Sequence, residues 1–138
     1  MFAKILTVVT GLVVWLAIVI VAGIILRLTW PAYESVAAAM TFTWPMLMAR
    51  LSISALATLA MGGVTAIIAS GFMIARLMPG FLLLLAFIPQ HIRLWDTFPI
   101  WYHVTFLLSL VPLTWLGGVI AGRWRGNRPS AFVYLPHE

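Results

Sequence analysis

The sequence predicts an all-α integral membrane protein, a four-helix transmembrane bundle with short loops and a kinked third helix. Of the 138 residues, 64% are hydrophobic and only 8% are charged, whereas soluble domains carry about a quarter charged residues. A soluble fold of this size has too much surface to hide so many apolar side chains, but an apolar exterior is stable in lipid. The chain also divides into four apolar stretches near the length of about 20 residues that crosses a bilayer. These spans are about 5–26, 46–75, 78–95 and 100–121, followed by a tail over 122–138, and 1–138 forms a single domain.

The first span, 5–26, is an uninterrupted apolar run. It is longer than the roughly 7 to 15 residues of a signal-peptide core, so we expect a retained helix rather than a cleaved signal. The mixed stretch that follows predicts a short helix over 32–42 on the membrane surface. Thr43 as an N-cap and Pro45 in the first turn then predict the start of the second helix. Within that helix, Arg50 is expected to reach back to the lipid headgroups.

The third span is the least regular of the four. A tight turn over 76–80 is expected to precede it, and its second half contains Pro89. Residues 77–95 suffice to cross the bilayer with a kink at this proline, and a half-helix that turns back is the alternative. The segment 96–99 then predicts a turn and the start of the fourth span.

Charges and aromatic residues predict that both termini are cytoplasmic. Five basic residues share a side with the termini, and three lie on the other side, so the positive-inside rule favours this orientation. The five are Lys4, Arg76, Arg123, Arg125 and Arg128, and the three are Arg27, Arg50 and Arg93. An interfacial aromatic belt falls on the opposite side and comprises Trp30, Tyr33, Trp44, Trp95, Trp101 and Tyr102. Small size, short loops and the lack of Cys favour a multi-pass protein of a bacterial inner (plasma) membrane.

A stripe of small residues predicts close helix packing. Small side chains let two helix backbones approach each other in lipid. The stripe on the second span repeats every four residues and comprises Ser54, Thr58, Gly62, Ala66 and Ser70. Gly118 and Gly122 form a shorter stripe at the end of the fourth span. We expect packing within this bundle first, with a second copy or another membrane protein as the alternative.

The candidate polar site comprises Gln90, His91, Arg93, Asp96 and His103. In a hairpin that turns near residue 97, both histidines lie six residues from the turn, which places them at a similar depth of about 9 Å. Ionisable groups at such a depth are costly and often mark functional sites. Arg93 and Asp96 are spaced to pair, or to bind an anionic group. The plainer interpretation is that these side chains lie at the interface and contact headgroups and loop carbonyls.

Several kinds of chemistry are disfavoured by the sequence. Without Cys there are no disulfides and no thiolate sites. The common catalytic motifs are absent, so no catalytic residues are assigned. Two histidines without a third ligand do not predict a metal site, and no cofactor is expected. The net charge of +5 is interpreted as topology and headgroup contact rather than nucleic-acid binding.

The sequence therefore favours a non-enzymatic accessory or structural subunit of a membrane assembly. Its expected partners are the lipid bilayer and either a second copy or another membrane protein. The alternative is a small transporter or membrane enzyme that uses His91, Arg93, Asp96 and His103 near the non-cytoplasmic face. A haem-bearing redox subunit is a third, weaker hypothesis.

Overall fold

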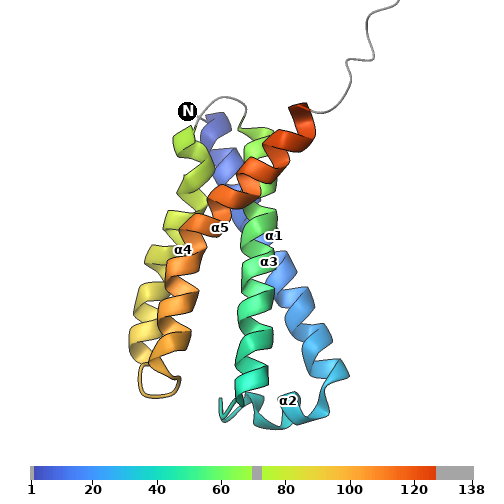
Figure 1. The fold of residues 1–138 in the computed structure, drawn as a ribbon, viewed down its shortest axis with the longest axis vertical. Coiled ribbons are helices and arrows are strands. Elements are labelled where there is room, and N and C mark those ends of the chain that lie inside the picture. The colour runs from blue at the N-terminus through green and yellow to red at the C-terminus, as the bar shows by residue number, and fades with distance from the viewer. Residues whose placement is uncertain (1, 70–72, 127–138) are drawn as a thin grey trace, which may run out of the picture.

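The computed structural model describes residues 2–69 and 73–126, and all regular structure within them is helical. The helices are α1 (Phe2–Thr29), α2 (Pro31–Ala37), α3 (Trp44–Ile68), α4 (Met73–Arg93) and α5 (Ile100–Gly126). The all-α prediction is confirmed. Figure 1 shows the start of α1 and the end of α5 at one end of the molecule, and α2 and the α4–α5 turn at the other.

Three of the described helices are long and apolar enough to cross a membrane, namely Ala3–Thr29, Trp44–Ile68 and Ile100–Arg125. Only 17% of the most apolar window of α1 is buried inside the protein. An exterior of this kind is typical of a surface that contacts lipid. The three candidate spans indicate a multi-pass membrane protein in contact with the bilayer. The described part of α4 is not among the three spans, and its last turn contains Gln90, His91 and Arg93.

The boundary between α3 and α4 differs from the prediction. A continuous helix over 46–75 is wrong, because α3 ends at Ile68 and Ala69 leaves the helical conformation. The tight turn predicted over 76–80 is also wrong, because α4 begins at Met73 and stays helical through Pro79 and Gly80. Pro79 is fully buried, and a Cβ added to Gly80 would lie 2.6 Å from Oγ1 of Thr114 in α5. Packing of Pro79 and Gly80 against neighbouring helices therefore outweighs the local preference of this Pro-Gly pair for a loop.

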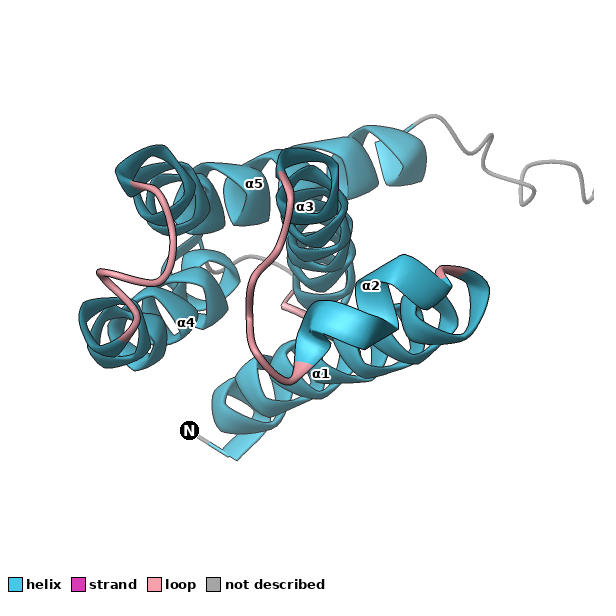
Figure 2. Cartoon of the chain, turned by 90° about the horizontal axis from the view of Figure 1, so that it is seen from below, coloured by secondary structure: helices cyan, strands magenta, loops and turns pink. Residues whose placement is uncertain are grey.

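The other boundaries lie closer to expectation. α2 forms within the predicted surface segment and lies across the end of the molecule (Figure 2). α3 starts at Trp44, with Thr43 as its N-cap and Pro45 in the first turn, as predicted. α5 continues past residue 121 to Gly126, and Arg125 in its last turn donates a 2.9 Å hydrogen bond to the carbonyl oxygen of Ile67. This bond satisfies one of the carbonyls left open at the end of α3. α4 remains helical through Pro89, so the kink there stays a prediction.

α3 is the central helix and packs against both α1 and α5, while α4 packs mainly on α5. The largest core cluster joins all four long helices and comprises Trp15, Ala57, Met61, Leu83, Phe106 and Leu110. The indole Nε1 of Trp15 donates a 3.1 Å hydrogen bond to Oγ1 of Thr58, whose hydroxyl donates to the Ser54 carbonyl. A buried indole therefore has a partner in the core, as its polar N–H requires.

Four of the predicted packing residues face the interior of the chain. Ser54, Thr58, Gly62 and Ala66 are all buried. A Cβ added to Gly62 would lie 2.8 Å from the carbonyl carbon of Thr114, so the backbones of α3 and α5 touch there. Of the remaining three, Gly118 faces Ala66 across this contact. A Cβ added to Gly122 would meet nothing within 4 Å. Ser70 lies outside the described residues.

Candidate functional site

Two buried histidines meet where α4 ends and α5 begins. His91 lies in the last turn of α4 and His103 in the first turn of α5, and their Nδ1 atoms are 2.7 Å apart. The side chain of His91 is 7% exposed and that of His103 is fully buried. The turn over 94–99 brings both imidazoles to one level, which is the arrangement that their equal spacing from residue 97 predicts.

Hydrogen bonding assigns the tautomers of this pair. Nε2 of His103 lies 3.2 Å from the carbonyl oxygen of Phe98, and because a carbonyl only accepts, this nitrogen carries a proton. A neutral His103 therefore accepts at Nδ1, and His91 donates from its own Nδ1. Nε2 of His91 is then an acceptor, and the described residues provide it with no hydrogen-bond partner. Since only one proton fits between the two Nδ1 atoms, the pair carries at most one positive charge.

Aromatic rings enclose the histidine pair. The ring of Trp95 stacks on His103 with centroids 5.1 Å apart, and the ring of Phe106 lies 4.7 Å from that of His91. Phe87, Phe98 and Tyr102 complete the enclosure. Rings of this kind exclude water and lower the local dielectric, which strengthens the hydrogen bonds inside.

Arg50 of α3 reaches into the same region and contacts side chains of α2, of α5 and of the loop between α2 and α3. Its Nη1 donates to the phenol oxygen of Tyr33 at 2.8 Å, and its Nε donates to that of Tyr102 at 3.4 Å. The guanidinium carbon lies 4.8 Å from the centroid of the Phe42 ring. All three partners are neutral, so a partly buried cation is held here without a carboxylate from the described residues.

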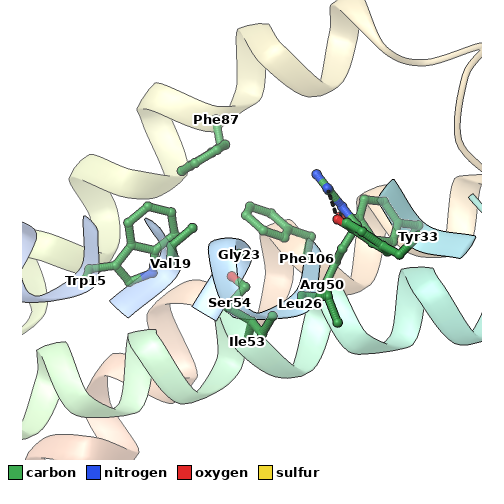
Figure 3. Close-up of a pocket in the computed structure, with 11 residues that line it drawn as sticks. Trp15, Val19, Gly23, Leu26, Tyr33, Arg50, Ile53, Ser54, Phe87 and Phe106 are labelled. Carbon is green, nitrogen blue, oxygen red and sulfur yellow. Dashed lines mark hydrogen bonds between the residues drawn. The ribbon is translucent and has the colours of Figure 1, made fainter. Parts of the chain in front are cut away.

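Two adjoining cavities meet at Arg50. The smaller, of about 160 Å³, extends from Arg50 and Tyr33 to Trp15 (Figure 3). The larger, of about 390 Å³, is lined by His91 and by charged and polar side chains that include Arg27 and Gln90. The two share four lining residues, Arg50, Phe87, Tyr102 and Phe106. A chamber with several polar side chains in a mainly apolar wall and a more apolar slot thus lie side by side, and Arg50 lines both.

The structure gathers only part of the predicted polar site. His91 and His103 meet, and Gln90 lines the larger cavity. Arg93 and Asp96 are exposed, and the ion pair expected between them does not form; the ion pair shown among the described residues joins Arg27 and Glu34.

Sequence reasoning missed the role of Arg50, Tyr33 and Tyr102. Arg50 carried one usable signal, because a cation inside an apolar span tends to face a cavity or the bundle interior. Tyr102 carried another, because it precedes His103 in a segment dense in aromatic and polar residues, 95–103. Nothing in the sequence placed Tyr33 near either of them.

The chain matches no protein-family model, no curated protein and no solved structure at a significant level. Fold and site together describe a small helical protein with three candidate membrane spans and a buried polar site near one end. Within residues 2–69 and 73–126, no third His, Cys, Asp or Glu joins the two histidines in a group able to hold a metal ion. The hydrogen-bonded histidine pair and the cavities beside it are the features of this protein that bear on its function.

Proposed function

We propose that α4 is a fourth membrane crossing and that both termini of the chain are cytoplasmic, in a bacterial inner membrane. In support, α4 runs beside α5 between the same two ends of the molecule (Figure 1). Exposed Trp44, Trp95 and Trp101 lie at the ends of helices near α2, where an interfacial belt would anchor them. The polar last turn of α4 then sits at headgroup depth, where it is least costly.

Reporter fusions test this topology. A reporter active only in the cytoplasm should be active after residue 126, and one active only outside should be active within 38–43 and 94–99. A C-terminal fusion that is active only outside, with the N-terminus inside, would show that α4 does not cross.

Within that topology, the chain acts as a small transport protein that receives a polar ligand from the non-cytoplasmic side. The contact between His91 and His103 carries this proposal. A buried polar pair enclosed by aromatic rings is a poor device for stability alone, because apolar side chains would fill the space at lower cost. The pair instead leaves Nε2 of His91 without a hydrogen-bond partner among the described residues, and His91 lines a cavity. In this arrangement His103 is a positioning residue and His91 contacts the ligand.

Complementation of a deletion strain tests the site. The variant His91→Ala/His103→Ala should reach the membrane at normal abundance and fail to restore the growth defect. Ile92→Ala is the matched control, since Ile92 lies in the same turn and is 67% exposed. Full complementation by the double variant would refute a functional role for the pair.

One observation favours a second candidate, the accessory subunit of a membrane assembly. A groove of about 590 Å³ between α3 and α5 has the small residues Ala60, Gly63, Gly117 and Ala121 in its wall, together with larger side chains that include Trp124 and Arg125. Small residues of this kind admit a partner helix at close range. The stripe that begins at Ser54 supports this role less than expected, because its described members are used inside the chain.

Filling the groove tests the accessory role. Ala121→Leu should abolish crosslinks to any partner in native membranes. Leu108→Phe, at a 70% exposed position on the same helix, should leave them intact. Crosslinks that persist in Ala121→Leu would count against docking in this groove.

A further inference from the structure

Positive charge is uncompensated in the chamber beside the histidine pair. Arg27 and Arg50 both line it. Nε of Arg27 lies 3.6 Å from Oε2 of Glu34, and both side chains are more than half exposed, so that cation is neutralised at the rim. Among the described residues, no carboxylate contacts Arg50. A cation removed from water without a counter-charge is costly, and a bound anion would remove that cost.

The partners of Arg50 leave hydrogen-bond donors available. A guanidinium has five N–H donors, and Arg50 uses two of them, at Nη1 and Nε, within the described residues. Tyr33 and Tyr102 each accept from Arg50 through the phenol oxygen and keep their own O–H proton to donate. Three guanidinium N–H groups and two phenol O–H groups therefore remain available around Arg50, and donors of this kind bind phosphate or carboxylate groups.

An apolar slot continues from this position. The smaller cavity is lined by Trp15, Val19, Leu26, Ile53 and Phe87, and Figure 3 shows Trp15 at the end remote from Arg50. A Cβ added to Gly23, on the α1 wall, would contact nothing within 4 Å. A free anion would make no favourable contact with such a slot. The hydrocarbon chain of an amphiphile would, because burying apolar surface is favourable.

We propose that Arg50, Tyr33 and Tyr102 bind the acidic head group, phosphate or carboxylate, of an anionic amphiphile whose chain occupies the slot toward Trp15. This inference rests on the proposed function, since it names the ligand class of the same site. The ligand enters from the non-cytoplasmic leaflet, and its head group lies in the chamber that His91 and Arg50 both line.

Binding to the purified full-length protein in dodecyl maltoside tests this ligand class. The probes are dodecyl phosphate, dodecanoate, inorganic phosphate and dodecyltrimethylammonium, followed by calorimetry and by native mass spectrometry. Dodecyl phosphate and dodecanoate should bind in a one-to-one complex, inorganic phosphate at least tenfold more weakly, and the cationic amphiphile not at all. Inorganic phosphate that binds as tightly as dodecyl phosphate would show a site for a free anion and overturn the amphiphile. If dodecyltrimethylammonium binds as tightly as dodecyl phosphate, the site recognises only the hydrocarbon chain, and the proposed acidic head group is overturned.

Variants locate the site. Arg50→Gln should weaken binding of dodecyl phosphate between about ten- and a hundredfold, the range expected for a hydrogen bond to a charged group. Arg93→Gln is the matched control, because Arg93 is exposed at the same end of the molecule, and it should bind as the parent does. Tyr33→Phe and Tyr102→Phe keep the cation and should each cost about three- to tenfold, so they test the site if Arg50→Gln fails to fold. Unchanged affinity in the folded variants would overturn the proposal.

The two proposals fail separately. If no anionic amphiphile binds, while His91→Ala/His103→Ala still fails to complement the deletion strain, the ligand class is wrong and the functional site stands. If the double histidine variant complements fully, the site has no function there, whatever dodecyl phosphate does in vitro.

Discussion

The contact between α3 and α5 gives the sharpest stability prediction, through Gly62. In Gly62→Ala, the new Cβ would lie 2.8 Å from the carbonyl carbon and 2.9 Å from the Cα of Thr114. Both contacts are to backbone, so no side-chain rotation relieves them. Gly117 makes the reciprocal contact, with its added Cβ at 2.9 Å from the carbonyl carbon of Leu59. We expect either alanine to destabilise the bundle.

The size of the effect follows from these distances. Carbon atoms pack best at about 3.5 Å or more, so relieving the 2.8 Å contact alone requires α3 and α5 to separate by about 0.7 Å, and the still closer approach of the added Cβ to the Thr114 carbonyl oxygen requires more. A gap of that size forfeits a quarter to a half of each dispersion contact along the seam. Overpacking of a tight contact typically costs about 1 to 3 kcal/mol. Gly122→Ala is the control in α5, because its added Cβ meets nothing within 4 Å, and it should gain up to about 1 kcal/mol from helix propensity.

Unfolding in mixed micelles measures the difference. Sodium dodecyl sulfate is titrated into protein in dodecyl maltoside, and helical circular dichroism gives the free energy of unfolding. Gly62→Ala and Gly117→Ala should each fall about 1 to 4 kcal/mol below Gly122→Ala. Equal stability of the three variants would mean that the backbones of α3 and α5 do not touch, and the packing argument would be refuted.

Three further predictions use the same titration. Gly11→Ala should destabilise the protein because the new Cβ would clash with Oγ1 of Thr65. Since this obstacle is a side chain, the double variant Gly11→Ala/Thr65→Ala should recover most of the lost stability. If stability is not recovered, the clash lies elsewhere. Trp15→Phe removes the 3.1 Å hydrogen bond to Thr58 and should cost about 1 kcal/mol, an effect that a Thr58→Val background should reduce. Glu34→Gln breaks an ion pair that is more than half exposed and should change stability by less than about 1 kcal/mol; a larger loss would mean that the pair is shielded from solvent.

The sequence predicted the histidine pair because that prediction needs only helical rise and a turn position. His91 and His103 are equidistant from residue 97, and any hairpin that turns there aligns them. The turn predicted over 76–80 failed for the opposite reason. Pro and Gly favour a turn locally, but Gly80 packs against Thr114, and this contact depends on how α4 and α5 approach. Tyr33 was unpredictable on the same ground, since its contact with Arg50 depends on where the short helix α2 lies.

Hydrogen bonding separates structural polar groups from candidate functional ones in this chain. Six threonines satisfy their hydroxyls locally, each donating to the carbonyl four residues earlier, and need no other helix. They are Thr7, Thr10, Thr29, Thr58, Thr65 and Thr114. His91 and Arg50 differ, because their partners come from other helices and part of their hydrogen-bonding capacity stays unused.

Unused hydrogen-bonding capacity is expensive where the polar atom is buried away from water. Among the described residues, the buried side-chain atom without a partner is Nε of Arg76, at the opposite end of the molecule. It stands apart from any histidine pair, whereas His91 and Arg50 line one cavity. His91 of α4 and Arg50 of α3 thus both line that cavity, the first with an imidazole and the second with a cation. Folding of the bundle does not require these two side chains to share a cavity. The cavity that they line is therefore where a ligand should be sought.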